Sequence, residues 1–182
     1  MTRLGNAVQQ FLDLRDWTDE IEDNEDKGSS RLKTGLVVDG QSCRLFIDTF
    51  EQTDSISLYL YPPFRMKLSN YAEACMLVNA INYGLRVARF EIDPSDGELR
   101  LVVAVDLHGA EVGGAFVDGM LGAASWTLDR WMVALAAVGV TGRKAVEVLE
   151  ADKREHEEEE AEAEVPDASS PLLASAGSGL AH

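Results

Sequence analysis

The sequence predicts an α+β domain in which helices cover one antiparallel sheet, followed by a disordered acidic tail. Two observations indicate this class. Apolar runs with strand-like alternation flank two turn signals, Asp39-Gly40 and the segment at residues 93–97, and Asp-Gly between two such runs is a strong hairpin signal. Three other segments repeat apolar residues at helical spacing. The expected order is therefore helix, three strands, helix, two strands, helix, or helix-β3-helix-β2-helix.

The first helix is expected at residues 6–17, where Val8 and Phe11 fall on one face and Asn6 is available as the N-cap. Trp17, at its end, is expected to close over the core. The acidic segment at residues 19–30 is expected to be a solvated connection with a short strand at its start. It lacks the alternating Asp/Asn spacing and the central glycine of an EF-hand, so no calcium site is predicted.

A meander of three strands should follow. Apolar and polar residues alternate along the second and third strands, which gives one apolar face and one mixed face. The strands are expected at residues 32–38, 42–50 and 56–61. Pro62-Pro63 then ends the meander, because proline has no amide hydrogen for a ladder.

A second helix should run to residue 85 with Ser69 or Asn70 as its N-cap. Its apolar residues fall along one stripe: Tyr71, Ala74, Cys75, Val78, Ile81 and Leu85. Strands at residues 87–92 and 98–107 then flank the 93–97 turn, in which Pro94 and Gly97 supply the required dihedral angles.

The last apolar segment, residues 112–138, is expected to be one long helix with two apolar sides. One stripe should cover the sheet: Val117, Leu121, Ala124, Leu128, Trp131, Met132 and Leu135. The opposite side carries small residues around one tryptophan: Ala115, Gly119, Gly122, Trp126, Val133 and Ala137. A helix that is apolar on two sides must be buried on two sides. This second side is the predicted dimer or partner surface, with Trp126 covered either by the first helix or by a second subunit.

Charge separates the chain into two expected parts. The 182 residues include 16 basic and 32 acidic residues, and residues 143–182 alone carry 4 and 11. We expect a folded domain at residues 1–142 and an acidic tail at residues 143–182, first partly helical and then disordered. The acidity makes nucleic acid or an anionic membrane an unfavourable partner. A basic partner peptide remains open.

The remaining composition predicts a cytoplasmic protein without metal or cofactor. No signal-peptide-like apolar run occurs at the N-terminus, and no stretch reaches the roughly 18 apolar residues of a membrane span. Cys43 and Cys75 lie inside apolar patterns and are expected to be small buried hydrophobes. His108, His156 and His182 are too far apart along the chain to predict a metal site.

Catalytic signatures are missing from the sequence. It contains no Gly-x-Ser-x-Gly elbow, no P-loop and no dinucleotide-binding glycine pattern. Carboxylate pairs such as Asp93 with Asp96, or Asp118 with Asp129, are expected to be solvated surface groups, since acidic residues are abundant. An enzyme with a cryptic carboxylate-based hydrolytic site, with His108 as a further candidate, is the alternative function.

Part of the chain resembles a known family. The helix sequence Leu77-Val78-Asn79-Ala80-Ile81-Asn82 leads into Ala88-Arg89-Phe90-Glu91-Ile92-Asp93 and then Gly97-Glu98-Leu99-Arg100-Leu101. Together with the order of elements, this pattern resembles the YbjN-domain family of sensory transduction regulators. The resemblance implies a type III secretion chaperone-like fold and a dimer, and it brings no catalytic residues.

The expected function is therefore binding. The leading hypothesis is a non-catalytic protein-interaction or chaperone-like regulatory domain, homodimeric, that captures a segment of a partner protein. In a further hypothesis the acidic tail masks the domain's own groove or binds a basic partner.

Overall fold

The computed structural model describes residues 1–163 and confirms the predicted α+β class. Its elements are α1 (Arg3–Leu14), β1 (Ile21–Asn24), β2 (Ser29–Val38), β3 (Gln41–Phe50), β4 (Ser55–Tyr61), α2 (Tyr71–Gly84), β5 (Ala88–Ile92), β6 (Leu99–Asp106), α3 (Gly114–Gly139) and α4 (Ala145–Ala163), with 3₁₀ turns at Glu25–Lys27 and Leu68–Asn70. The six strands form one antiparallel sheet in the order β1-β2-β3-β4-β6-β5. The short strand expected at the start of residues 19–30 is β1.

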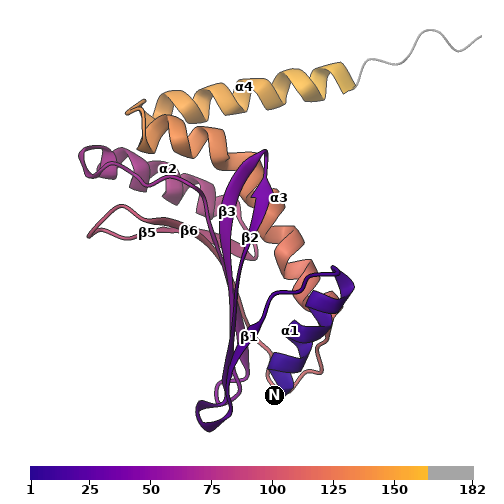
Figure 1. Cartoon of the computed structure of the whole chain (residues 1–182). Coiled ribbons are helices and arrows are strands. Elements are labelled where there is room, and N and C mark those ends of the chain that lie inside the picture. The colour runs from indigo at the N-terminus through magenta and orange to yellow at the C-terminus, as the bar shows by residue number, and fades with distance from the viewer. Residues whose placement is uncertain (164–182) are drawn as a thin grey trace, which may run out of the picture. The chain divides into compact units, whose positions relative to one another are not determined.

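The core lies on one face of this sheet. A single row of direct partners crosses five strands, from β2 to β5: Leu32, Ile47, Leu58, Val103 and Ala88. All five side chains are buried. Helices α1 and α3 lie on this side of the sheet (Figure 1). The period of two along each strand therefore places every second residue under the helices.

Helix α1 begins earlier than the sequence predicts. The side chain of Thr2 accepts a hydrogen bond from the backbone N–H of Gly5, at 3.0 Å, and caps the helix at Arg3. Asn6, the predicted cap, is an exposed residue inside the helix. The helix ends at Leu14, so Trp17 lies in the connection to β1.

Helix α2 differs from prediction at its start. Asn70 holds the N-cap position, but its side-chain amide donates to the carbonyl oxygen of Gly139, at 3.1 Å, and forms no cap. Ala74, Val78 and Ile81 of the predicted stripe are buried, whereas Cys75 is only half-buried, contrary to expectation.

Glu73 ties α2 to the start of α4. Its carboxylate accepts hydrogen bonds from Lys144 Nζ, at 2.8 Å, and from the backbone N–H of Ala145, at 3.0 Å. The hydrogen bond from Lys144, followed by that from Ala145, lowers the pKa of Glu73. The carboxylate therefore stabilises the fold most at pH values at which Glu73 is ionised in both the folded and the unfolded chain.

Glu73→Gln is expected to lower stability at pH 7 and to lose that effect in acid. Because the folded-state pKa of Glu73 lies below its usual value of 4.5, its contribution is complete above 4.5 and disappears as the pH falls through the folded pKa. Urea unfolding of both proteins at pH 7 and at pH 3 measures this. A stability difference that stayed constant between the two pH values would contradict the role assigned to Glu73.

The chain divides into Met1–Val148 and Leu149–His182. Ala145 and Val148 in the first turn of α4 are buried. Residues 145–163 are helical, within the segment where helix was expected. The stretch expected to be disordered, residues 166–182 with His182, lies outside the described residues. Within residues 1–163, no helix combines the length and the apolar character that crossing a membrane requires.

Candidate functional site

Helix α3 has one buried and one exposed apolar side. The buried side matches the predicted sheet-covering stripe: Val117, Leu121, Ala124, Leu128, Met132 and Leu135 are all buried. Trp131 is the exception, because it is only half-buried and the guanidinium of Arg130 lies 4.5 Å from its ring centre. The expectation that Trp131 belongs to the core was therefore wrong.

The other side of α3 forms a surface that we call the exposed α3 face. It consists of Ala115, Gly119, Gly122, Trp126, Val133 and Ala137, all exposed except the half-buried Ala137. Trp126 is 69% exposed and Val133 is 74% exposed. Helix α1 therefore does not cover Trp126, which removes one of the two predicted explanations. Apolar exposure on this scale is typical of interaction surfaces.

Two apolar hollows lie at the ends of the exposed α3 face. At the C-terminal half of the helix, a hollow of about 470 Å³ is lined by Phe64, Met132, Val133 and Ala137, together with residues of the β2–β3 turn. At the N-terminal end, a second hollow of about 470 Å³ lies between Ala115 and Leu14 of α1. The face thus continues into recesses that can accept side chains of a bound chain.

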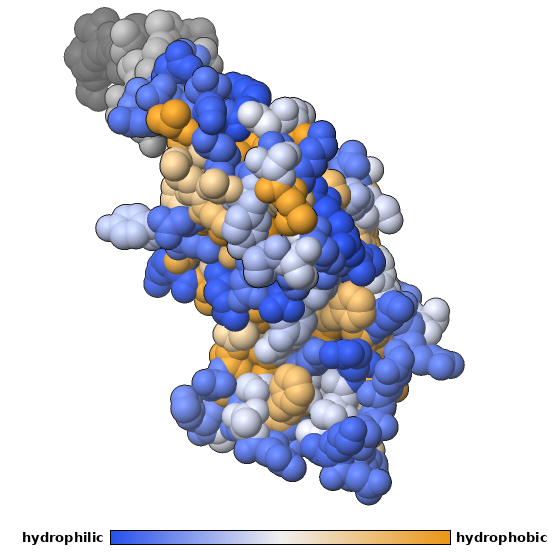
Figure 2. All heavy atoms as spheres, turned by 90° about the vertical axis from the view of Figure 1, so that its left-hand side faces the viewer, coloured by the Kyte–Doolittle hydropathy of each residue, from blue (hydrophilic) through white to orange (hydrophobic). Residues whose placement is uncertain are grey.

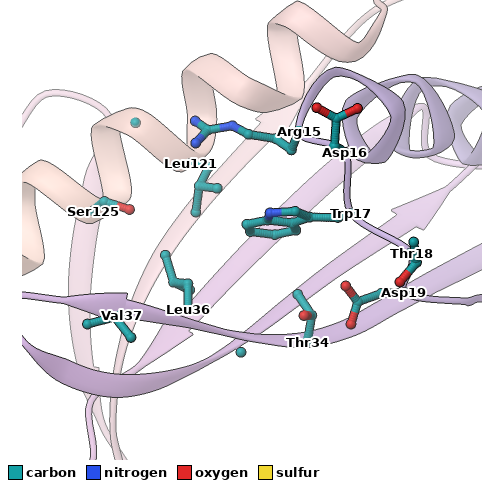
Figure 3. Close-up of a pocket in the computed structure, with 12 residues that line it drawn as sticks. Arg15, Asp16, Trp17, Thr18, Asp19, Thr34, Leu36, Val37, Leu121 and Ser125 are labelled. Atoms are coloured by element: carbon teal, nitrogen blue, oxygen red, sulfur yellow. The ribbon is translucent and has the colours of Figure 1, made fainter.

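A larger hollow, of about 630 Å³, lies beside the middle of α3 (Figure 3). The ring of Trp17 forms one wall and meets Phe11 edge-on, with ring centres 5.5 Å apart. Leu121 of α3 and Leu36 of β2 point toward this ring from the two flanking elements (Figure 3). From the sequence, Trp17 was expected to close over the core. The sequence did not indicate that a hollow lies between Trp17 and β2.

Strand β2 is only partly paired on the side of this hollow. Its partner β1 covers Ser29 to Leu32, whereas β3 pairs with the whole of β2, from Ser29 to Val38. In the part of the chain that the structure describes, residues 33–38 therefore have no second partner strand. We call this segment the free β2 edge.

The sheet face opposite the helices is mixed, as predicted, and rich in arginine and tyrosine. Phe46 and Tyr61 meet edge-on at 5.5 Å. Arg44 lies 4.7 Å above the Tyr61 ring, and Arg100 lies 5.0 Å above the Tyr59 ring. Seen from this side, the surface is largely hydrophilic with separate apolar patches (Figure 2).

Most charged side chains on this face form ion pairs. Arg31 binds the carboxylate of Asp48 with two hydrogen bonds, of 2.6 and 2.7 Å, which raises the pKa of Arg31. Burial raises the pKa of Glu91, but hydrogen bonds from Arg100 and Arg89 outweigh it and leave that pKa below its usual value. The carboxylate of Glu91 is therefore held ionised by two arginines and is poorly suited to proton transfer.

The residues considered as catalytic candidates take part in local turns and ion pairs. His108 is an exposed turn residue with a φ of 50°. Asp93 accepts hydrogen bonds from the N–H and the hydroxyl of Ser95, which lower its pKa, and Asp96 pairs with Arg65. Asp118 pairs with Arg15 at 2.5 Å.

Cys43 does not sit in a reactive setting. Cys43 is buried, as predicted, and burial raises the pKa of its thiol. Across residues 1–163, no three side chains of His, Cys, Asp or Glu come together in a group that could hold a metal ion.

The comparison with known families agrees with the pattern seen in the sequence. Residues 5–136 match the YbjN family, described as "Putative bacterial sensory transduction regulator". The crystal structure of YbjN from E. coli is similar at 13% identity and a TM-score of 0.47, over 71% of this chain and 87% of that one. A chain of the ExsC–ExsE complex is similar at 10% identity and a TM-score of 0.47, over 74% and 97%. No curated protein matches the chain.

Proposed function

The chain belongs to the YbjN family, and from this membership and its surface we propose that it is a non-catalytic protein-interaction domain. It works as a homodimer joined through the exposed α3 face and captures a segment of a partner protein. The observation that carries the proposal is the pair of large apolar side chains, Trp126 and Val133, that α3 presents at 69% and 74% exposure. Burying one tryptophan contributes about 2–3 kcal/mol before entropy is counted.

The spacing of the face supports a second copy as its occupant. When two identical helices cross antiparallel with Trp126 at the two-fold axis, residues equidistant from position 126 face each other. Gly119 then lies opposite Val133, so that the larger side chain meets an open backbone, and Ala115 lies opposite Ala137. An isologous interface requires this self-complementarity.

The glycines of the face leave room for that approach. A Cβ placed on Gly119 or Gly122 would meet no atom within 4 Å, so both positions open directly to the outside of the helix. Small residues allow two helix backbones to come close together. Within α3 itself, the charged side chains are those of Asp118, Asp129 and Arg130, and Asp118 is paired with Arg15.

Paired cysteines test this arrangement. In a Cys75→Ser background, one protein carries Gly119→Cys and the other Val133→Cys. Mild oxidation of the mixture should link the two different proteins, because positions 119 and 133 face each other across the axis. Either protein alone should stay unlinked, since two copies of position 119 lie about 21 Å apart along antiparallel helices.

A matched control uses Gly84→Cys, at the open C-terminal end of α2, where a Cβ also meets nothing within 4 Å. This protein should link neither to itself nor to Val133→Cys. Self-linking of Gly119→Cys would indicate a different pairing of the helices. Absence of linking in every mixture, at concentrations of tens of micromolar, would remove the dimer from the proposal.

A further inference from the structure

The backbone of the free β2 edge carries hydrogen-bonding groups that point away from the sheet. The two-residue turn Asp39-Gly40 has φ values of 46° and 68° and closes the β2–β3 hairpin at Val38 and Gln41. Such a turn closes on a hydrogen-bonded pair, and the bonds then alternate along the strand. The backbone N–H and C=O groups of the even-numbered residues of β2 therefore form hydrogen bonds with β3. Gly28, just before the strand, follows the same alternation, because its carbonyl accepts a hydrogen bond from Glu51 N–H at 2.8 Å.

The odd-numbered residues, Lys33, Gly35 and Val37, direct their N–H and C=O groups outward. An unpaired edge of this kind is a template for another strand. Val37 strengthens that character, because its side chain is 69% exposed.

The surroundings of the edge differ on its two sides. On the helix side, Thr34, Gly35 and Leu36 line the 630 Å³ hollow that Trp17 and Leu121 complete. Trp17, Leu36 and Leu121 give this hollow an apolar wall, and Arg15, Asp16 and Asp19 line the rest of it. An apolar side chain entering from a neighbouring strand would pack against the apolar wall.

On the opposite side lie Lys33 and, one strand inward beside Gly35, Arg44. Lys33 forms no ion pair within residues 1–163, although most basic side chains of this face are paired. The chain as a whole has a net charge of -16. The ammonium group of Lys33 is nevertheless a local position that favours a carboxylate of a bound segment.

We propose that the captured partner segment is an extended strand that adds to β2 at residues 33–38, with apolar side chains in the Trp17 hollow alternating with acidic side chains beside Lys33. This inference rests on the proposed capture function and specifies its site and the chemistry of its ligand. Backbone hydrogen bonds hold the added strand, and the alternation of its side chains provides selectivity.

The probe is a ten-residue synthetic peptide that alternates valine and glutamate, and the readout is amide hydrogen exchange followed residue by residue. The amides of Lys33, Gly35 and Val37 should become protected when the peptide binds. Those of Thr34, Leu36 and Val38, already bonded to β3, should not change. A peptide alternating valine and lysine should bind at least about 10-fold more weakly, since it places ammonium groups beside Lys33.

Val37→Pro supplies the matching variant. Proline removes one outward N–H and leaves the bonds to β3, so affinity for the valine–glutamate peptide should fall about 10-fold. Val37→Thr, which keeps the N–H and the branched side chain, should bind as the parent protein does. Retained protection of Thr34, Leu36 and Val38 shows that the variant is folded.

Several results would overturn this inference. They are the absence of binding at millimolar peptide, binding without protection of Lys33, Gly35 and Val37, or equal binding of the lysine peptide. Protection of these amides in the free protein that disappears on dilution would place a second copy at the edge instead. Sedimentation of the same samples reports the α3 dimer separately, so that a failure of either proposal is recognised.

Discussion

Trp126→Glu is expected to convert a dimer into a folded monomer. Trp126 is 69% exposed within one chain, so its replacement removes little from the monomer's own core. In the proposed dimer the two copies of this residue meet at the axis. The change removes two buried indoles and places two carboxylates close together.

The expected effect on self-association is large. Each tryptophan contributes about 2–3 kcal/mol through burial, so the dissociation constant should rise at least about 100-fold. Sedimentation velocity over a range of protein concentrations measures it. Thermal unfolding of the variant at a concentration where both proteins are monomeric should match the parent within about 1 kcal/mol.

Tyr83→Glu is the matched control. Tyr83 is an aromatic residue on α2 that is 95% exposed, and it lies outside the exposed α3 face. This variant carries the same added charge and should leave the dissociation constant unchanged. Equal weakening by both variants would point to net charge, rather than the α3 face, as the cause.

Gly97→Ala is expected to lower the free energy of unfolding by about 3 kcal/mol. Gly97 has a φ of 74°, a conformation that costs an alanine about 1–2 kcal/mol. A Cβ at this position would also collide with the backbone carbonyl of Met66. That carbonyl belongs to a residue whose N–H donates to Gly97, at 2.8 Å, so the backbone cannot move away without loss of a hydrogen bond.

Gly40→Ala separates the two contributions to this loss. Gly40 has a φ of 68°, yet a Cβ there would meet nothing within 4 Å. The variant should lose only the conformational part, about 1–2 kcal/mol. Chemical denaturation of both variants beside the parent gives the comparison, and equal losses would show that the contact with Met66 is not decisive.

The sequence was sufficient for the elements whose two sides have contrasting polarity. Alternation placed β3 and β4, and the two apolar sides of α3 indicated that Trp126 and Val133 lie away from the sheet. The hairpin at Asp39-Gly40 followed from local turn chemistry alone. These features depend on neighbouring residues in the chain, so a pattern can reveal them.

Other features depend on contacts between distant segments. Thr2 caps α1 through its hydroxyl, which apolar periodicity does not indicate. The side chain of Asn70 does not cap α2, because it donates instead to the carbonyl oxygen of Gly139 in α3. The free β2 edge exists because β1 pairs only as far as Leu32. The sequence of residues 33–38 does not indicate where β1 ends. The Trp17 hollow could not be predicted either, because it also depends on contacts between segments that are distant in the sequence.

The most direct test of the central claim, that a second copy covers the exposed α3 face, is the mass of the protein in solution. Light scattering at tens of micromolar should give twice the 19.9 kDa of one chain, and dilution should bring the mass down toward that of one chain. A mass of 19.9 kDa throughout that range would contradict the account, because Trp126 and Val133 would then face water.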